Sequence, residues 1–82
     1  MAKLIKLSDL LPDEECRIVA VDSKPEIRRR LLDMGLIPGT LVCCAFKSPW
    51  GDPSAYWVRG ALVALRQEDA EKILITESFG GV

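Results

Sequence analysis

The amino-acid sequence predicts a single, mainly β domain: a small barrel with one short helix inserted between its first two long strands. Its 82 residues, 49% of them hydrophobic, are enough for one compact core and too few for two. Short apolar segments with an alternating, period-two pattern recur along the chain, and one segment has a clear helical period. A closed or nearly closed barrel is expected because closure removes strand edges that would otherwise aggregate.

The inserted helix has signals for its start and for its buried face. Its apolar stripe is Ile27, Leu31 and Met34, which recur at helical spacing. Ser23 and Glu26 have the spacing of a capping box, and Pro25 fits the first turn, where its missing N–H is no loss. These residues predict a helix with a defined beginning.

The end of the helix is equally marked. Gly35 is expected to adopt a left-handed conformation that turns the chain off the helix, and Leu36 to fold back on Leu31 in a Schellman-type contact. Pro38 and Gly39 then prevent the helix from continuing and direct the chain into a strand.

The other elements follow from alternation and turn residues. Strands are expected over 15–21, 40–46, 55–59, 61–66 and 73–76, with Gly60 permitting a bend or bulge. A helical turn capped by Ser8 is expected over 7–11, a loop over 48–53 and one or two helical turns over 67–72. The side chains expected to be buried are Ile18, Leu31, Val42, Phe46, Val58, Val63 and Leu65.

Residues 1–77 are expected to form the domain and residues 78–82 a flexible tail. The formal charge of −1 argues against non-specific attraction to nucleic acid or an anionic membrane. No apolar run approaches the roughly 18 residues needed to span a bilayer, and the first residues lack the apolar segment of a signal peptide. We therefore expect a cytoplasmic protein that neither inserts into the membrane nor binds nucleic acid.

The chain contains no histidine, which excludes Ser-His and Cys-His nucleophile pairs and removes the commonest ligand of catalytic zinc. It also has no phosphate-binding loop and no dinucleotide fingerprint. The sequence therefore predicts no catalytic residues and no enzyme activity.

Three blocks of the sequence resemble the FeoA family, the small cytoplasmic accessory proteins of prokaryotic ferrous iron uptake. The matching positions include Leu31, Met34, Gly35, Leu36, Pro38, Gly39, Gly51, Asp52, Pro53, Arg59 and Gly60. They occur in order over nearly the whole chain. The resemblance implies an SH3-like barrel and a partner, the cytoplasmic part of the FeoB membrane transporter with its GTP-binding domain.

Two other functions are alternatives to this one. A metal-responsive regulatory domain is the alternative, because the C-terminal domain of iron-dependent repressors has a similar fold; that function would require an attached helix-turn-helix domain. A reader of proline-rich peptides needs a groove of clustered aromatic side chains, whereas the five aromatics of this chain are scattered.

The cysteines have both a structural and a metal-binding interpretation. Cys43 and Cys44 point to opposite faces of one strand, so they cannot hold one ion together without a distortion such as a bulge. Cys16 and Cys43 remain weak candidates for a loosely held iron or zinc ion, and packing is the favoured interpretation. An odd number of cysteines argues against a disulfide framework.

Two surfaces are candidates for partner binding. On the helix, Arg28 and Arg29 have two interpretations. They form either a solvated face with Arg30, paired with Glu26 and Asp33, or a basic patch that binds an acidic protein. A nucleic-acid backbone is disfavoured as the partner, because this segment has no aromatic side chains on which bases could stack.

The second surface is apolar. If Val58, Val63 and Leu65 point inward, the face opposite to them carries Trp57, Leu62 and Leu41, and such exposed patches mark binding sites. Trp50 would extend this surface from the loop over 48–53. A strand register shifted by one residue would instead place Trp57 in the core. The same surface could support a weak homodimer.

Overall fold

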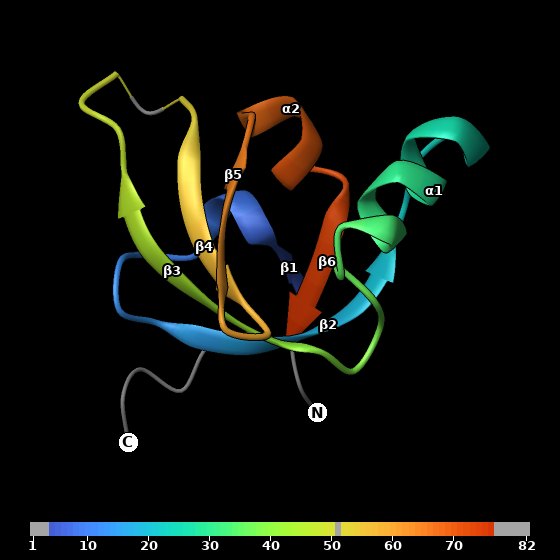
Figure 1. Ribbon diagram of the computed structural model, residues 1–82, viewed down its shortest axis with the longest axis horizontal. Coiled ribbons are helices and arrows are strands. Elements are labelled where there is room, and N and C mark those ends of the chain that lie inside the picture. The colour runs from blue at the N-terminus through green and yellow to red at the C-terminus, as the bar shows by residue number, and fades with distance from the viewer. Residues whose placement is uncertain (1–3, 51, 77–82) are drawn as a thin grey trace.

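The computed structural model describes residues 4–50 and 52–76, and consists of six strands, two short α-helices and one 3₁₀ turn (Figure 1). In chain order these are β1 (Leu4–Lys6), η1 (Leu7–Asp9), β2 (Glu15–Val21), α1 (Pro25–Asp33), β3 (Leu41–Lys47), β4 (Ser54–Val58), β5 (Ala61–Leu65), α2 (Gln67–Ala70) and β6 (Ile73–Thr76). The expected tail at 78–82 lies outside the described residues. Neither described helix is long and apolar enough to cross a membrane.

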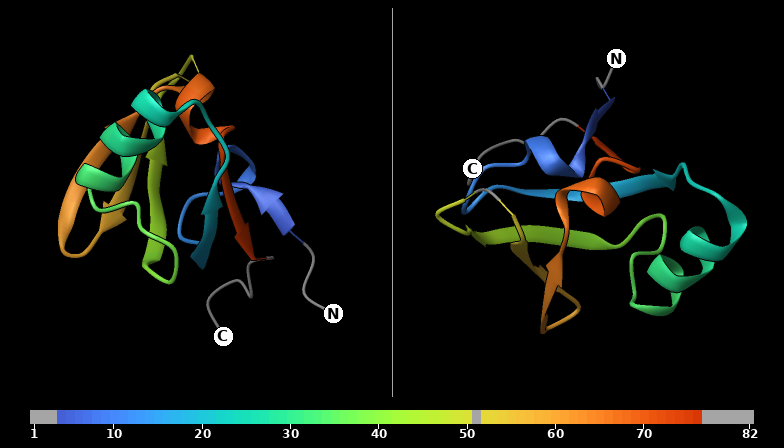
Figure 2. Two further views of the ribbon diagram at one scale, coloured as in Figure 1. Left: turned by 90° about the vertical axis from the view of Figure 1, so that its right-hand side faces the viewer. Right: turned by 90° about the horizontal axis from the view of Figure 1, so that it is seen from above.

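The six strands form one antiparallel sheet in the order β1-β6-β2-β3-β4-β5. Figure 2 shows that the sheet is strongly curved, so that β4 and β5 turn away from β6 and β1. The barrel is nevertheless not closed: among the described residues, β1 and β5 are the two edges of the sheet. The chain reaches β6 through α2, and β6 pairs with β1 and β2 instead of β5.

The concave side of the sheet holds a single core. It contains Leu31 from α1 and the inward-facing residues of every strand from β2 to β6, with Tyr56 the largest fully buried side chain. Of the expected core, Ile18, Leu31, Val42, Val58 and Leu65 are buried as predicted, and Val63 is partly buried.

The prediction that Phe46 is buried is wrong, since 53% of its surface is exposed. The pairing of β3 with β4 shifts between Cys44 and Phe46, so Ala45 has no partner of its own on β4. A bulge of this kind adds one residue to a strand and moves the residues after it to the other face. Strict alternation along β3 therefore fails beyond Cys44.

The exit from α1 has the predicted geometry. Gly35 has φ +96°, its N–H donates to Leu32 O at 2.9 Å, and the Leu36 N–H donates to Leu31 O at 3.1 Å. This is the hydrogen-bond pattern of a Schellman motif, and it places two buried leucines against each other across the turn.

Three details of the helical segments differ from expectation. Lys24 occupies the N-cap of α1 without a side-chain hydrogen bond, so the capping box of Ser23 and Glu26 does not form, although Pro25 is at the first position. Met34 is the C-cap and is exposed, so it does not continue the buried stripe. The turn η1 begins after Lys6 and has no side-chain cap from Ser8.

Strand β4 ends one residue earlier than predicted, at Val58. Arg59 lies in the turn instead of in the strand, and the two turn residues, Arg59 and Gly60, both have positive φ, +51° and +84°. Two consecutive positive φ values are typical of the type I′ turn that joins twisted antiparallel strands. The short strand β1 was not predicted, because three residues are too few to show a period.

Candidate docking face

A row of side chains crosses the outer, convex face of the sheet. Glu15 on β2 is paired with Cys43 on β3, Cys43 with Trp57 on β4, and Trp57 with Leu62 on β5. We call these four residues the outer row. Residues paired directly across a sheet point to the same side, so this register brings together side chains from four strands.

Beyond Glu15, the outer row is apolar, and its last two residues are open to solvent. Trp57 and Leu62 are each 49% exposed, and Leu41 lies two residues from Cys43 on the same face and is also exposed. A shallow hollow of about 310 Å³ lies beside Trp57, with Glu15 and Arg59 among its lining residues. The predicted outward orientation of Trp57, Leu62 and Leu41 is therefore confirmed.

Trp50 lies in a different part of the β3–β4 hairpin from Trp57. It is 91% exposed in the connection between β3 and β4, whereas Trp57 lies near the opposite end of this hairpin, next to the β4–β5 turn. Figure 1 shows the two ends at the top and bottom of the sheet. Even Pro53, the residue of this connection that directly precedes β4, is four residues from Trp57, which corresponds to about 13 Å along a strand. Trp50 and Trp57 thus lie towards the two ends of one hairpin; Gly51 lies outside the described residues.

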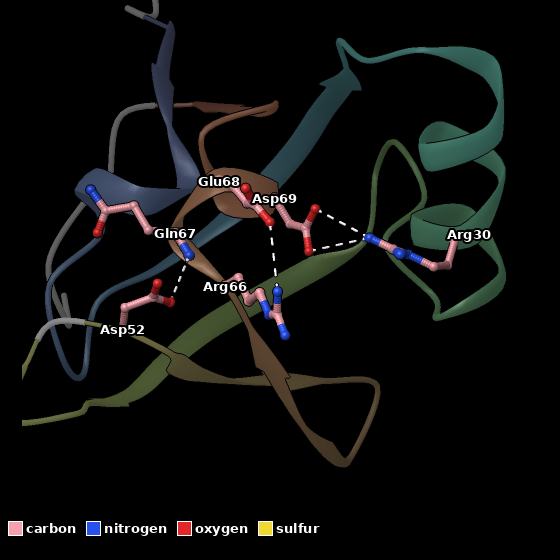
Figure 3. A network of polar contacts seen from close by, with 6 residues as sticks. All are labelled: Arg30, Asp52, Arg66, Gln67, Glu68 and Asp69. Carbon is pink, nitrogen blue, oxygen red and sulfur yellow. Dashed lines mark hydrogen bonds and ion pairs between the residues drawn. The ribbon is translucent and has the colours of Figure 1, made fainter.

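Arg28 and Arg29 are exposed on α1, which Figure 1 shows at the opposite side of the view from β3 and β4. Arg30 forms an ion pair with Asp69 of α2 at 3.3 Å, rather than with Glu26 or Asp33 (Figure 3). The basic helix is thus linked to the second helix through one arginine and presents the other two to solvent.

Asp52 has a structural role that its place in the sequence did not reveal. Its Oδ1 accepts a hydrogen bond of 2.9 Å from the Gln67 N–H, at the first position of α2 (Figure 3). The residue that precedes this helix, Arg66, provides no side-chain cap. Asp52 therefore satisfies from a distant loop one of the N–H groups that a helix leaves unpaired at its start.

The three cysteines occupy different environments. Cys16 and Cys44 are buried among the core side chains, and Cys43 is partly exposed in the outer row. Burial, with smaller contributions from Cys43, Glu14 and Glu15, raises the pKa of the Cys16 thiol to about 12.

Burial and the charges of Glu15 and Asp13 also raise the pKa of the Cys43 thiol. A thiol binds a metal ion as its thiolate, which these environments disfavour. Within residues 4–50 and 52–76, no three Cys, Asp or Glu side chains lie together where they could hold a metal ion. The arrangement fits the packing interpretation of Cys16 and Cys44.

Comparison with known proteins agrees with this fold. The family model described as the FeoA domain matches residues 5–77. A fusion of Fe(2+) transport protein A with Fe(2+) transporter FeoB, from Porphyromonas gingivalis, is 35% identical over 69 residues. This match covers 84% of the present chain and 8% of the fusion protein, so the chain corresponds to a small part of that relative.

Several solved structures are similar throughout the chain. A FeoA-like protein from Clostridium acetobutylicum is 32% identical, with a TM-score of 0.86 and coverage of 96% of this chain and 91% of that chain. The FeoA of Stenotrophomonas maltophilia, solved with zinc and described as a prokaryotic SH3 domain protein, is 27% identical, with a TM-score of 0.77 and coverage of 87% and 88%.

A larger protein also contains this fold. The IdeR protein of T. acidophilum is 26% identical, with a TM-score of 0.78, and the match covers 89% of this chain and 33% of IdeR. The family model nevertheless spans nearly the entire described domain, with its SH3-like sheet and the inserted helix α1. The chain belongs to the FeoA family.

Proposed function

We propose that this chain is a non-enzymatic accessory protein of ferrous iron uptake that acts in the cytoplasm by binding the cytoplasmic part of a FeoB-type transporter. The observation that carries the proposal is the relative in which a FeoA region and a FeoB transporter share one polypeptide. Two domains joined in one protein have a high effective concentration for each other, which is an advantage when they work in contact.

The docking surface in this proposal is the outer face that carries Leu41, Trp57 and Leu62. Trp57 is half-exposed on this face. In a domain of only 82 residues, burial of a tryptophan side chain in the core would stabilise the fold. Large apolar side chains left at the surface in a group are typical of binding sites, and tryptophan is enriched among the residues that dominate binding energy.

A binding titration with three variants tests the proposal. The purified chain is titrated with the soluble GTP-binding domain of a FeoB protein, with and without iron(II), by isothermal calorimetry in the absence of oxygen. Trp57→Ala is expected to weaken binding at least tenfold, since truncation of a central tryptophan often costs about 2 kcal/mol or more. Trp50→Ala reports separately on the β3–β4 loop.

Arg29→Glu on α1 is the matched control, because Arg29 is exposed and lies on a different element. It is expected to bind within a factor of two of the unmodified chain, and all three variants are expected to keep its melting temperature within a few degrees. Loss of binding in Arg29→Glu alone would assign docking to the basic helix. Absence of binding by the unmodified chain would contradict the proposal itself.

The second candidate function is a metal-responsive regulatory domain, which the likeness to T. acidophilum IdeR favours. Thermal unfolding with increasing iron(II) or zinc(II) separates it from the first. A regulatory metal site raises the melting temperature in a saturable way, because an ion that binds only the folded state stabilises it.

A further inference from the structure

The strand β5 has one side without a partner in the described structure. It pairs with β4 on one side, and no strand of residues 4–50 or 52–76 pairs with the other. Figure 2 shows β5 as the last strand of the curved sheet. An edge of this kind presents backbone N–H and C=O groups that an additional strand can bind.

The register identifies which groups these are. Val58 and Ala61 flank the two-residue turn and form the first hydrogen-bonded pair, so the backbone groups of Ala61, Val63 and Leu65 point towards β4. The backbone groups of Leu62 and Ala64 therefore point away from β4, to the unpaired side of β5. No backbone hydrogen bond from elsewhere in the described residues reaches either one.

The composition of β5 does not protect this edge. Its sequence is Ala-Leu-Val-Ala-Leu, with no charged residue and no proline. Soluble proteins normally block an exposed edge with lysine, proline, a bulge or a covering segment. The β5 sequence therefore carries none of the residues that block an edge, which is consistent with a strand that binds there.

The two ends of β5 indicate the charge of the incoming segment. Arg59 precedes the strand and Arg66 follows it, both exposed and roughly 20 Å apart along the chain direction. Arg66 has a loose ion pair with Glu68, 3.9 Å between Nη1 and Oε1, with both side chains mostly exposed. Such a pair is easily exchanged for another carboxylate.

These arginines also disfavour a second copy of the chain. Antiparallel pairing of two β5 strands centred on Val63 would set Arg66 of one copy beside the turn that carries Arg59 of the other. Like charges at both ends of the shared strand would repel, whereas carboxylates at both ends of a foreign strand would attract.

The two faces beside the edge differ in polarity. On the convex side, the neighbour of an incoming strand is Leu62, at the end of the outer row. Beside Ala64 and Leu65 it meets a hollow of about 380 Å³ whose walls include Met34 and Arg30 of α1 and Glu68 and Asp69 of α2. An alternation of apolar and polar side chains suits these two surroundings.

We infer that β5 is a strand-addition site, at which the protein partner contributes an extended segment of alternating apolar and polar residues with an acidic residue at each end. The inference rests on the proposed function for the existence of a protein partner. It adds how the partner binds: backbone hydrogen bonds to Leu62 and Ala64, an apolar contact that continues from Trp57 through Leu62, and ion pairs with Arg59 and Arg66.

A nuclear magnetic resonance titration tests the site without a transporter. The probe is the blocked peptide Asp-Val-Thr-Val-Thr-Val-Asp, added to the full chain, with Lys-Val-Thr-Val-Thr-Val-Lys as the matched control. The acidic peptide is expected to shift the amide resonances of Leu62 and Ala64 most and to slow their hydrogen exchange at least tenfold. Equal effects of the two peptides, or shifts elsewhere only, would overturn the inference.

Variants of β5 extend the test to the FeoB domain. Ala64→Pro removes an outward N–H while leaving the pairing with β4, and Ala64→Thr retains the N–H at the same exposed position. Ala64→Pro is expected to weaken binding at least tenfold and Ala64→Thr less than twofold. Arg59→Asn combined with Arg66→Gln is expected to weaken it about fivefold, and asparagine suits the positive φ of the turn.

The outcomes separate this inference from the proposed function. Normal binding of the FeoB domain by a folded Ala64→Pro variant would overturn strand addition and leave the proposed function standing. Failure of the unmodified chain to bind the FeoB domain, with the peptide result as expected, would overturn only the proposed function. A dimer that Ala64→Pro abolishes would show that a second copy of the chain occupies the edge. Peptide binding only after removal of residues 77–82 would show that this segment occupies it. Either result would overturn the inference.

Discussion

Replacement of Gly35 by valine tests the turn that joins α1 to the rest of the domain. Gly35 has φ +96°, a conformation that costs an L-residue about 1–2 kcal/mol. A Cβ atom built at this position would lie 3.5 Å from Cγ1 of Val58 and 3.8 Å from Cδ of Arg59. Alanine would therefore be in van der Waals contact, and the two further methyl groups of valine would overlap these neighbours.

The expected loss of stability combines these two contributions. Overpacking of a filled site costs about 1–3 kcal/mol, so Gly35→Val is expected to lose about 2–5 kcal/mol in total. A domain of this size has a free energy of unfolding of roughly 4–12 kcal/mol, so the variant would be seriously destabilised. Urea denaturation monitored by tryptophan fluorescence and circular dichroism measures the difference.

Gly39 provides the matched control, since it has φ +91° and no heavy atom within 4 Å of the position that a Cβ would occupy. Gly39→Val is expected to show the conformational cost alone, about 1–2 kcal/mol. If Gly35→Val and Gly39→Val lose the same amount, the contact with Val58 is not part of the effect. If Gly35→Val unfolds at the same urea concentration as the unmodified chain, Gly35 is not a left-handed cap.

Two further predictions concern the loop contact and the buried ionisable groups. Asp52→Ala is expected to lower the free energy of unfolding by about 1 kcal/mol through loss of the bond to Gln67, and Asp52→Asn, which retains an acceptor oxygen, by less; equal losses in urea melts would argue against this cap. Burial raises the pKa of Cys16 from 9.0 to about 12 and that of Tyr56 from 10.0 to about 12, so the unfolded chain releases these protons first as the pH rises. Their contribution to stability is complete below pH 9 and is lost progressively between about pH 9 and 12. Cys16→Ala and Tyr56→Phe are each expected to make the melting temperature fall less steeply over this range. An unchanged pH dependence of the melting temperature in both variants would contradict the assignment.

Local signals predicted the elements on which the domain is built. The spans of β2 and β6 agree with those expected, and the Schellman exit of α1 follows from Gly35 and Leu36 because its hydrogen bonds join residues within one turn. Alternation over β4 and β5 was also sufficient to orient Trp57 and Leu62 correctly, since neither strand contains a bulge in their pairing.

Phe46 shows where local pattern is insufficient. The bulge at Ala45 depends on the pairing of β3 with β4, and nothing in the β3 sequence itself announces an unpaired residue. The same limit applies to the candidate site. How far Trp50 lies from Trp57 depends on the length of the β3–β4 hairpin, which is set by the pairing of the two strands.

By itself, the sequence determined the helix and its exit, most of the strands, the outward orientation of Trp57 and the membership of a family. The tertiary structure decided that β5 is an edge of the sheet among residues 4–50 and 52–76, that Arg30 pairs with Asp69 and that Asp52 caps a helix 15 residues away. The physical reason is the range of the interactions. Capping turns and alternation depend on residues close together in the chain, whereas strand partners, bulges and contacts between helices depend on which distant segments the folded core brings side by side.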